Sequence, residues 1–314
     1  MADTNQVALW YVAEDTAGTT PTNSTGWKTL RFTGESLMPK YGTEQSQQIR
    51  ADRARSDVMQ VSATIDGDIN YELHGNILDD FGPAATGGGW QTFTQGDVLK
   101  IGTTKRSFTV AKIFNDLPSG AKFDRYVGMS VGQLTMALQY GQRATGTLSM
   151  MGLGVTEDTV SPVGTGTLAP APTTMILNGT TDVIEAKIDA VGGLYISQLN
   201  LTIGANLRGK TAIGNKFPFA NGYGSAMIEG SFQAHFESRI AEDKVRSGAP
   251  FALKFTLVAG AKSYEINIPR AFHTSRDGLS ANAMDSDIMP TYSFSGSYDT
   301  AFNSPIVITR FNTP

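Results

Sequence analysis

The chain has 314 residues and a formal net charge of −4 at pH 7; 40 % of its residues are hydrophobic and 17 % are charged. This balance predicts a globular chain of one large domain or two ordinary ones. The charge argues against a general nucleic-acid-binding protein, which needs clustered lysine and arginine. Because cysteine is absent, disulfides, thiolate zinc sites and cysteine nucleophiles are excluded.

Composition also predicts the fold class. The 34 glycines and 13 prolines favour many short strands and turns over helical bundles. The start, MADTNQVALWYVAED, has no basic stretch followed by an apolar run, so we expect no exported precursor. No window approaches the roughly 20 apolar residues of a membrane-spanning helix, so we expect no membrane partner.

The first 26 residues carry an apolar cluster, VALWYV at 7–12, and then the turn-rich stretch TAGTTPTNSTG. We expect an N-terminal arm over residues 1–26. The first strand is predicted at Trp27–Phe32. Residues 34–60 show neither a two-residue nor a 3.6-residue repeat, which predicts a long loop that is either functional or disordered. The mixed charges of this loop are also compatible with a solvated, mobile face.

The stretch Ser62–Leu73, SATIDGDINYEL, alternates apolar and polar residues and predicts a half-buried strand. Gly67 interrupts the alternation, as a bulge or a close backbone approach would. A short helix is predicted next, capped by Asn76 and stopped by Gly82-Pro83, with two aspartates near its positive end.

Alternating segments predict strands through the rest of a first domain, residues 27–155. Residues 156–182 combine proline, glycine and threonine with few charges and predict a connector. A second domain, residues 183–314, is expected to repeat the plan with a strand, a helix from about Ser238 to Ser247 and further strands. The closing segment, IVITRFNTP, is expected to be one more edge strand.

An internal duplication is suggested by three echoes that occur in the same order. Ser62–Leu73 returns as SAMIEGSFQAHF at 225–236, the strand at 107–110 resembles 263–266, and 147–152 resembles 291–296. Such self-similarity predicts a repeated architecture, although any two amphipathic strands share some resemblance. We therefore predict a mainly β fold of two tandem β-sandwich domains, each with one short flanking α-helix.

No active site is apparent. The three histidines, His74, His235 and His273, do not lie in a metal-ligand spacing, and sheet-face positions explain His74 and His235 better. Nucleophile elbows, phosphate loops and dinucleotide fingerprints are absent. The acidic pairs lack the spacing of a calcium loop. We expect no catalysis, metal or cofactor, and exposed strand edges instead indicate assembly with other chains.

Several stretches resemble the major tail tube proteins of long, non-contractile-tailed bacteriophages. They include LRFTGESL at 30–37, IRADRARSD at 49–57, IDGDINYEL at 65–73, GTLSMMGLG at 146–154 and YISQLNLTIGANLRGKTAIG at 195–214. The resemblance covers nearly the whole chain. It implies a β-sandwich with a flanking helix that forms rings, and rings that stack into a tube around a channel for DNA. It also implies that the loop after the first strand reaches the neighbouring ring.

This resemblance implies a virion location, assembly in the host cytoplasm, and partners that include the tape measure protein and genomic DNA in the lumen, with tail terminator and distal tail proteins at the tube ends. Two tandem domains would let a trimer fill a six-membered ring. The competing function is a receptor- or carbohydrate-binding virion protein, since β-sandwiches serve both. The inter-ring contact residues are predicted to be Lys40, Arg50, Asp52, Arg53, Arg55 and Asp57.

Overall fold

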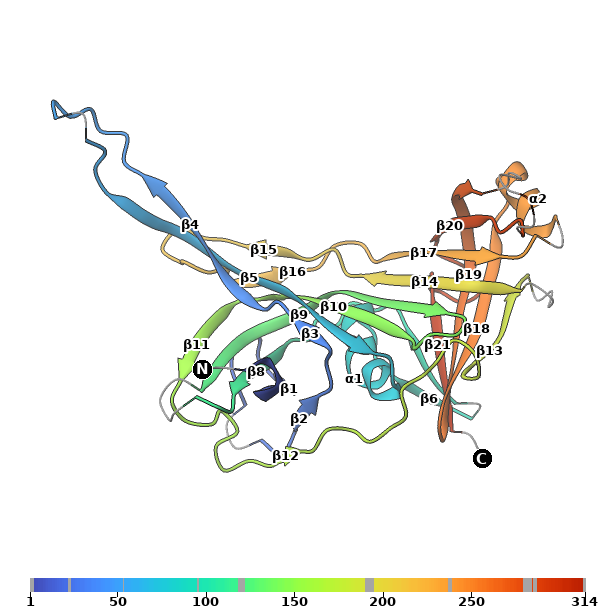
Figure 1. The fold of residues 1–314 in the computed structure, drawn as a ribbon, viewed down its shortest axis with the longest axis horizontal. Helices are drawn as coiled ribbons and strands as arrows, with labels where there is room; N and C mark the ends of the chain where they lie inside the picture. The colour runs from blue at the N-terminus through green and yellow to red at the C-terminus, as the bar shows by residue number, and fades with distance from the viewer. Residues whose placement is uncertain are drawn as a thin grey trace.

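The computed structural model describes residues 3–21, 24–52, 54–94, 96–117, 122–189, 195–236, 239–278, 284 and 287–312. The fold is mainly β, as expected, and its described part contains two α-helices and a short 3-10 turn at Thr4–Gln6. Figure 1 shows strands running through the whole molecule, a long two-stranded arm leaving it on one side, and a helix in each part of the chain.

One large antiparallel sheet runs across the molecule in the order β4–β5–β10–β9–β14–β17–β20–β19. A short additional strand, β3, pairs with β5 beside β4. The strands span β3 Gly34–Glu35, β4 Met38–Gln45, β5 Val58–Glu72, β9 Phe123–Gln139, β10 Thr145–Gly152, β14 Ile196–Gly204, β17 Met227–Ala234, β19 Lys262–Asp277 and β20 Thr291–Gly296.

The first half of the chain, from β1 to β11, folds a second layer against this sheet. Strand β1 pairs with β8, β8 pairs with the beginning of β9, and β11 pairs with the same part of β9. Strand β2 lies beside β1, and β12 lies beside β2. The bounds are β1 Val7–Ala13, β2 Trp27–Leu30, β8 Phe108–Phe114, β11 Gly154–Asp158, β12 Leu168–Ala169 and helix α1 Gly75–Thr86.

The second half, from β13 to β21, is built in the same way. Strand β13 pairs with β18, β18 pairs with β19, and β21 pairs with β19. A hairpin of the first half, β6–β7, adds to the far edge of β21. The bounds are β6 Gln91–Phe93, β7 Gly96–Lys100, β13 Val183–Ile188, β15 Arg208–Lys210, β16 Ala220–Gly222, β18 Phe251–Ala259, β21 Val307–Asn312 and helix α2 Ile240–Ser247.

The two halves have the same strand pairings. In each half, the strand that precedes the helix, β5 or β17, pairs with a neighbouring strand on either side. In chain order, β1, β4, β5, α1, β8, β9, β10 and β11 of the first half correspond to β13, β14, β17, α2, β18, β19, β20 and β21 of the second. The resemblance of 107–110 to 263–266 does not join equivalent strands. Residues 108–110 begin β8, whose counterpart is β18, whereas 263–266 lie in β19. A single apolar core runs through both halves, so the predicted domains and their boundaries remain a prediction.

The predicted N-terminal arm is not separate from the body over Val7–Ala13. This segment is strand β1, and its Leu9, Tyr11 and Val12 side chains are buried. The apolar cluster therefore belongs to the core, as its hydrophobicity requires. The C-terminal segment also differs from expectation, because β21 lies between β19 and β7 and is not an edge strand. Both termini of the described chain are thus held by the sheets.

Helix α1 continues past the predicted stop at Gly82-Pro83. Pro83 lies inside the helix, which ends at Thr86 before Gly87 with φ 64°. A proline in a helix leaves the carbonyl four residues earlier without its usual N–H donor. Here that carbonyl belongs to Asp79, and the indole Nε1–H of Trp90 donates to it at 3.2 Å. A tertiary hydrogen bond therefore permits the extra turn.

The long loop predicted at 34–60 is mostly a β-hairpin, which we call the arm. Strands β4 and β5 pair from Met38 and Asp66 out to Gln45 and Val58, and only residues 46–57 form the tip. Figure 1 shows the arm extending away from the body. Most side chains of β4 and of the beginning of β5 are exposed. Because neither face of the hairpin packs on a core, the sequence has no reason to alternate there.

Candidate assembly surfaces

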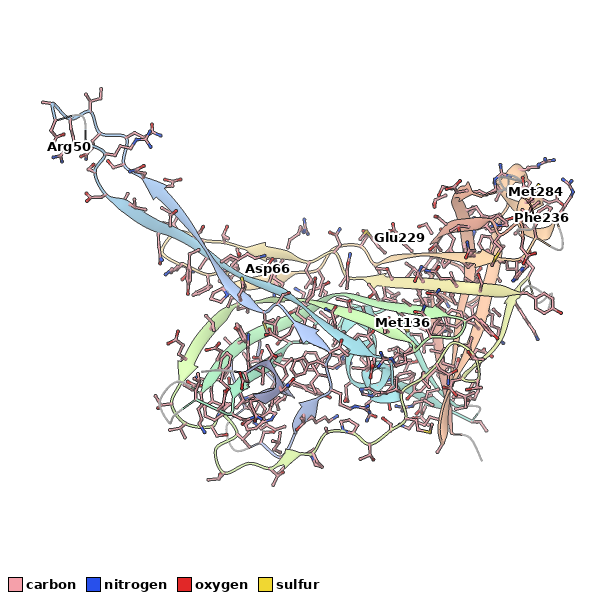
Figure 2. The ribbon with its side chains drawn as sticks, viewed as in Figure 1. Arg50, Asp66, Met136, Glu229, Phe236 and Met284 are labelled. Atoms are coloured by element: carbon pink, nitrogen blue, oxygen red, sulfur yellow. The ribbon has the colours of Figure 1, made fainter. Side chains whose placement is uncertain are left out.

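The large sheet has one core face and one polar face. Core-facing side chains such as Ile69, Leu134 and Ile203 are fully buried. The intervening residues of the strands are polar: they include Asp66, Asp68, Asn70, Gln133, Thr135, Thr147, Ser149, Asn200, Thr202, Glu229, Ser231 and Ser293. In Figure 2, Glu229 lies above the sheet and Met136 below it. The predicted polar-out, apolar-in alternation is therefore confirmed.

The charges on the polar face are mainly acidic. Lys40 is a basic side chain of this face, and its Nζ lies 2.6 Å from the Asp66 carboxylate. Asp68 and Glu229 lie on the same face. Glu72, at the end of β5, accepts from Arg143 at 2.5 Å. A sheet face with this charge offers few sites that could bind phosphates.

The two halves join through the edges of β9 and β14. Seven antiparallel residue pairs connect Gln133–Gln139 with Gln198–Gly204. The pairs alternate between apolar ones on the core side, such as Leu134 with Ile203, and polar ones, such as Thr135 with Thr202. We call this contact the internal junction. It makes the sheet continuous from one half to the other.

Each end of the large sheet leaves a free edge. Among the described residues, strand β4 pairs with β5 on one side only, and the last part of β19, from Phe272 to Asp277, pairs with β20 on one side only. The side chains from Thr274 to Asp277 are exposed. Unpaired N–H and C=O groups at such edges can pair with another chain.

The predicted inter-ring residues lie along the arm. Lys40 lies at its base, and Arg50 and Asp52 form an ion pair of 2.7 Å at its tip, where Figure 2 labels Arg50. Arg50 hydrogen-bonds to Asp52 and thereby holds the pKa of that carboxyl below its usual value. Arg55 donates to the Gln45 side chain at 3.1 Å.

Of the two remaining predicted residues, Asp57 and Arg53, the structure describes Asp57. Asp57 lies where the hairpin closes, and its main-chain carbonyl accepts from Ser46 N–H at 2.9 Å. Arg53 lies outside the described residues. Of the described charges, the arm carries Arg50, Asp52, Arg55 and Asp57 toward its exposed end, while Lys40 belongs to the polar face.

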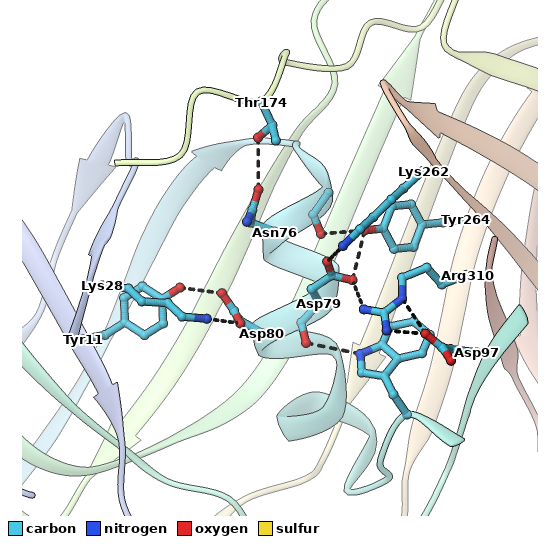
Figure 3. A network of polar contacts seen from close by, with 12 residues as sticks. Tyr11, Lys28, Asn76, Asp79, Asp80, Asp97, Thr174, Lys262, Tyr264 and Arg310 are labelled. Carbon is cyan, nitrogen blue, oxygen red and sulfur yellow. Dashed lines mark hydrogen bonds and ion pairs between the residues drawn. The ribbon is translucent and has the colours of Figure 1, made fainter. Parts of the chain in front are cut away.

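A partly buried polar network, missed by sequence reasoning, links α1 to the second half (Figure 3). Asp79 lies 2.6 Å from Lys262 and 2.7 Å from Arg310, and it accepts from Tyr264 Oη–H at 2.9 Å. Arg310 also binds Asp97 of β7 and lies over the Trp90 ring at 4.5 Å. Burial raises the pKa of Tyr264, and the charge of Asp79 adds to this effect.

The neighbouring aspartate, Asp80, connects α1 to the first half in the same view. Its carboxylate accepts from Tyr11 Oη–H at 2.7 Å and lies 2.6 Å from Lys28 Nζ. One helix turn therefore holds β1 and β2 on one side and β19 and β21 on the other. Sequence reasoning could assign these aspartates only to the beginning of the helix, because their partners are remote in the chain.

The expected sheet-face positions of His74 and His235 are wrong, because His74 immediately precedes α1 and His235 follows the end of β17. His74 is 2 % exposed, and burial followed by the nearby Arg31 charge lowers its pKa to about 4. His273 stacks on Phe251 with ring centroids 4.2 Å apart, and burial lowers its pKa to about 4. Within the described ranges, groups of three side chains able to hold a metal do not occur. The described helices are also too short to cross a membrane.

A family model for phage tail tube proteins matches residues 4–296. The match covers the first half, the arm, the internal junction and the second half as far as β20. None of the curated proteins compared with the chain matches it.

Proposed function

This chain belongs to the phage tail tube protein family, a structural component of the virion tail, and we propose that it polymerises into stacked rings whose lumen conducts DNA during ejection. The proposal extends the family assignment to a specific geometry. It rests above all on the internal junction, in which one half of the chain extends the sheet of the other by edge pairing.

The junction supports a trimeric ring. Two halves with the same strand pairings lie side by side in one sheet, so three chains supply six similar units. A head-to-tail contact with a suitable rotation closes into a ring, and closure of a sheet removes its free edges. The ring then has true three-fold and approximate six-fold symmetry. On this proposal the two halves are the predicted domains, and residues 156–182 carry the chain from one to the other.

The polar face of the large sheet is the proposed lumen surface. DNA must slide without binding, and each phosphate held by a lysine or arginine would act as a salt-dependent brake. The mainly acidic and uncharged side chains of this face suit that requirement, because its Lys40 is already paired with Asp66. The tape measure protein would occupy the same lumen before ejection.

The arm is the proposed contact between stacked rings. Its tip carries exposed charges that the body does not cover, and it extends beyond the large sheet. Terminator and distal tail proteins would meet the corresponding surfaces at the two ends of the tube. Assembly would take place in the host cytoplasm, where the finished tail joins the virion.

Negative-stain microscopy of the purified chain tests the proposed function directly. We expect rings and tubes to form as concentration rises, and sedimentation to show trimers before tubes. A chain that stays a monodisperse monomer at all concentrations, with its fold intact by circular dichroism, would contradict the proposal.

A further inference from the structure

We infer that copies of this chain join by antiparallel pairing of β19 in one copy with β4 in the next, in a register that sets Ser275 opposite Lys40 and Asp277 opposite Met38. This inference rests on the proposed ring and specifies its second contact, which we call the closing junction. We obtain the register by replacing β9 and β14 of the internal junction with their counterparts at the free edges, β19 and β4.

The correspondence between β9 and β19 is fixed by a shared bulge. In the first half, Gly132 is the extra residue where the partners of β9 pass from Ser149 to Met150. In the second half, Thr274 is the extra residue where the partners of β19 pass from Ser293 to Phe294. Gln133 therefore corresponds to Ser275, and Thr135 to Asp277.

The correspondence between β14 and β4 is fixed by the strand that both adjoin. Gly204 pairs with Met227, and Lys40 pairs with Thr64. Met227 and Thr64 are themselves equivalent, because each precedes the isoleucine shared by the two copies of the sequence repeat. Lys40 thus takes the place of Gly204, and Met38 takes that of Thr202. The observed pair Gln133 with Gly204 becomes Ser275 with Lys40.

The hydrogen-bonding directions agree with this register. Ala205 N–H donates to Gly132 O at 2.8 Å across the internal junction, so the equivalent donor at the closing junction is Tyr41 N–H and the acceptor is Thr274 O. Ser36 N–H points to β5, where it donates to Asp68 O at 2.9 Å. Residues two and four positions further along β4 point the same way, which leaves Pro39 and Tyr41 facing the free edge.

The free edge also shows where the closing junction ends. Leu37 N–H donates to Glu35 Oε2 at 2.9 Å, and Leu37 O accepts from Tyr126 Oη–H at 3.1 Å. Both groups are therefore unavailable to another chain. Pro39 has no N–H, a common protection of edge strands. The ladder is accordingly shorter than the seven pairs of the internal junction.

The paired strands of the arm, Met38–Gln45 with Val58–Asp66, supply a second surface for the same neighbour, and we call this paired part the arm base. In the second half, the connection from β14 to β17 is the ribbon β15–β16, which lies over the first half. Asn221 of this ribbon donates to Gly128 O, Ser130 Oγ and Met151 O, each at 3.1 Å. The arm is the equivalent connection, from β4 to β5, and Figure 1 shows arm and ribbon extending in the same direction.

The arm base carries exposed apolar side chains, whereas the ribbon buries Asn221 against the first half. Its exposed side chains include Met38, Tyr41, Val58, Met59 and Val61, which are 52 %, 46 %, 65 %, 55 % and 48 % exposed. By the same correspondence, Val58 replaces Asn221, and Phe272 replaces Ser130. A polar contact inside the chain thus becomes an apolar contact between chains. These side chains fit the edge of a second copy better than they fit water.

Cysteine pairing tests the register, because the natural chain has no cysteine. Residues opposite each other in a non-hydrogen-bonded pair are close enough for a disulfide, whereas diagonal residues are too far apart. We therefore compare K40C with S275C and M38C with D277C, both expected in register, against K40C with D277C and M38C with S275C, which use the same four substitutions out of register. Within one chain these positions lie at opposite ends of the large sheet.

We expect oxidation of assembled rings to give covalent dimers and trimers for both in-register pairs, at least tenfold more than for the shifted pairs. Equal or preferential linkage of the shifted pairs, or tubes without linkage of any pair, would overturn the proposed register while leaving the tube function intact. Failure of the unsubstituted chain to form rings would instead contradict the function. As an independent check, V58D should abolish ring closure but not folding; normal rings in V58D would refute the role of the arm base.

Discussion

Gly67 and Gly230 occupy equivalent positions in the two halves, and each lies against the main chain of the adjacent strand. A Cβ atom at Gly67 would lie 2.6 Å from the main-chain carbonyl oxygen of Ser36, and one at Gly230 would lie 2.3 Å from that of Asn200. Each glycine thus lets the adjacent strand approach closely. Of the two explanations for the glycine in the repeated sequence, a close backbone approach is correct, and no bulge occurs at Gly67 in its pairing with β10.

Replacing either glycine with alanine should destabilise the subunit. The added methyl group would meet main-chain atoms, which cannot move without shifting a strand, and overpacking of this kind costs about 1–3 kcal/mol. Urea unfolding of G67A and G230A measures the loss. G34A is the matched control, because its Cβ would make only an ordinary 3.6 Å contact with the Asn70 side chain. Equal stability of all three variants would contradict the close approach.

The Asp79 network should stabilise the contact between α1 and the second half. D79N removes the charge that Lys262 and Arg310 contact at 2.6 Å and 2.7 Å, and because these side chains are partly buried, we expect a loss of about 1–3 kcal/mol. We expect a lower urea midpoint and earlier loss of protection in β19 and β21 by hydrogen exchange. D52N, which breaks an ion pair at the exposed arm tip, should leave both measurements unchanged. A D79N variant as stable as D52N would show that the network contributes little.

The buried histidines should make stability depend on pH between about 4 and 6.5. Both have pKa values lowered from 6.5 to about 4, so in this range the unfolded chain binds protons that the folded chain does not. The free energy of unfolding should therefore fall as pH falls through this window, by up to about 3 kcal/mol for His74. Urea titrations at pH 7, 5.5 and 4.5 measure the slope. H74Q should flatten it, and an unchanged slope would argue against the buried neutral histidine.

Charge reversal at the arm tip should impair tube growth without unfolding the subunit. Arg50 and Arg55 have local partners in the subunit, so R50E with R55E leaves the core untouched. We expect rings that stack poorly, seen as short or absent tubes by microscopy. Two reversals are needed because a single exposed pair contributes little. R239E, at the exposed start of α2 and away from the arm, is the control. Tubes of normal length in the double variant would exclude a stacking role for these charges.

The parts of the fold that were predictable from sequence are those in which a strand has one buried face. Ile65, Ile69 and Tyr71 are buried and alternate with polar residues, so period two identified β5 and, in the same way, β9 and β17. The arm lacks a buried face and therefore lacks that signal. Helix α1 was predicted too short because its passage through Pro83 depends on Trp90, whose hydrogen bond is tertiary.

The candidate surfaces were predictable only in part. The charged segment at 49–57 is visible in the sequence, and the structure places it at the arm tip. The Asp79 network was not predictable, since its partners Lys262 and Arg310 lie 183 and 231 residues away. The free edges were equally hidden, because strand order depends on which elements pair and leaves no local pattern in the chain.

In the proposed tube, three chains, each supplying two similar units, close one ring. A helical reconstruction of tubes assembled from the purified chain decides this, because it counts the chains in each ring and locates both halves. We expect three chains per ring, with the two halves at the same radius and their polar sheet faces lining the lumen. Six chains per ring, or halves at different radii, would refute the trimeric ring.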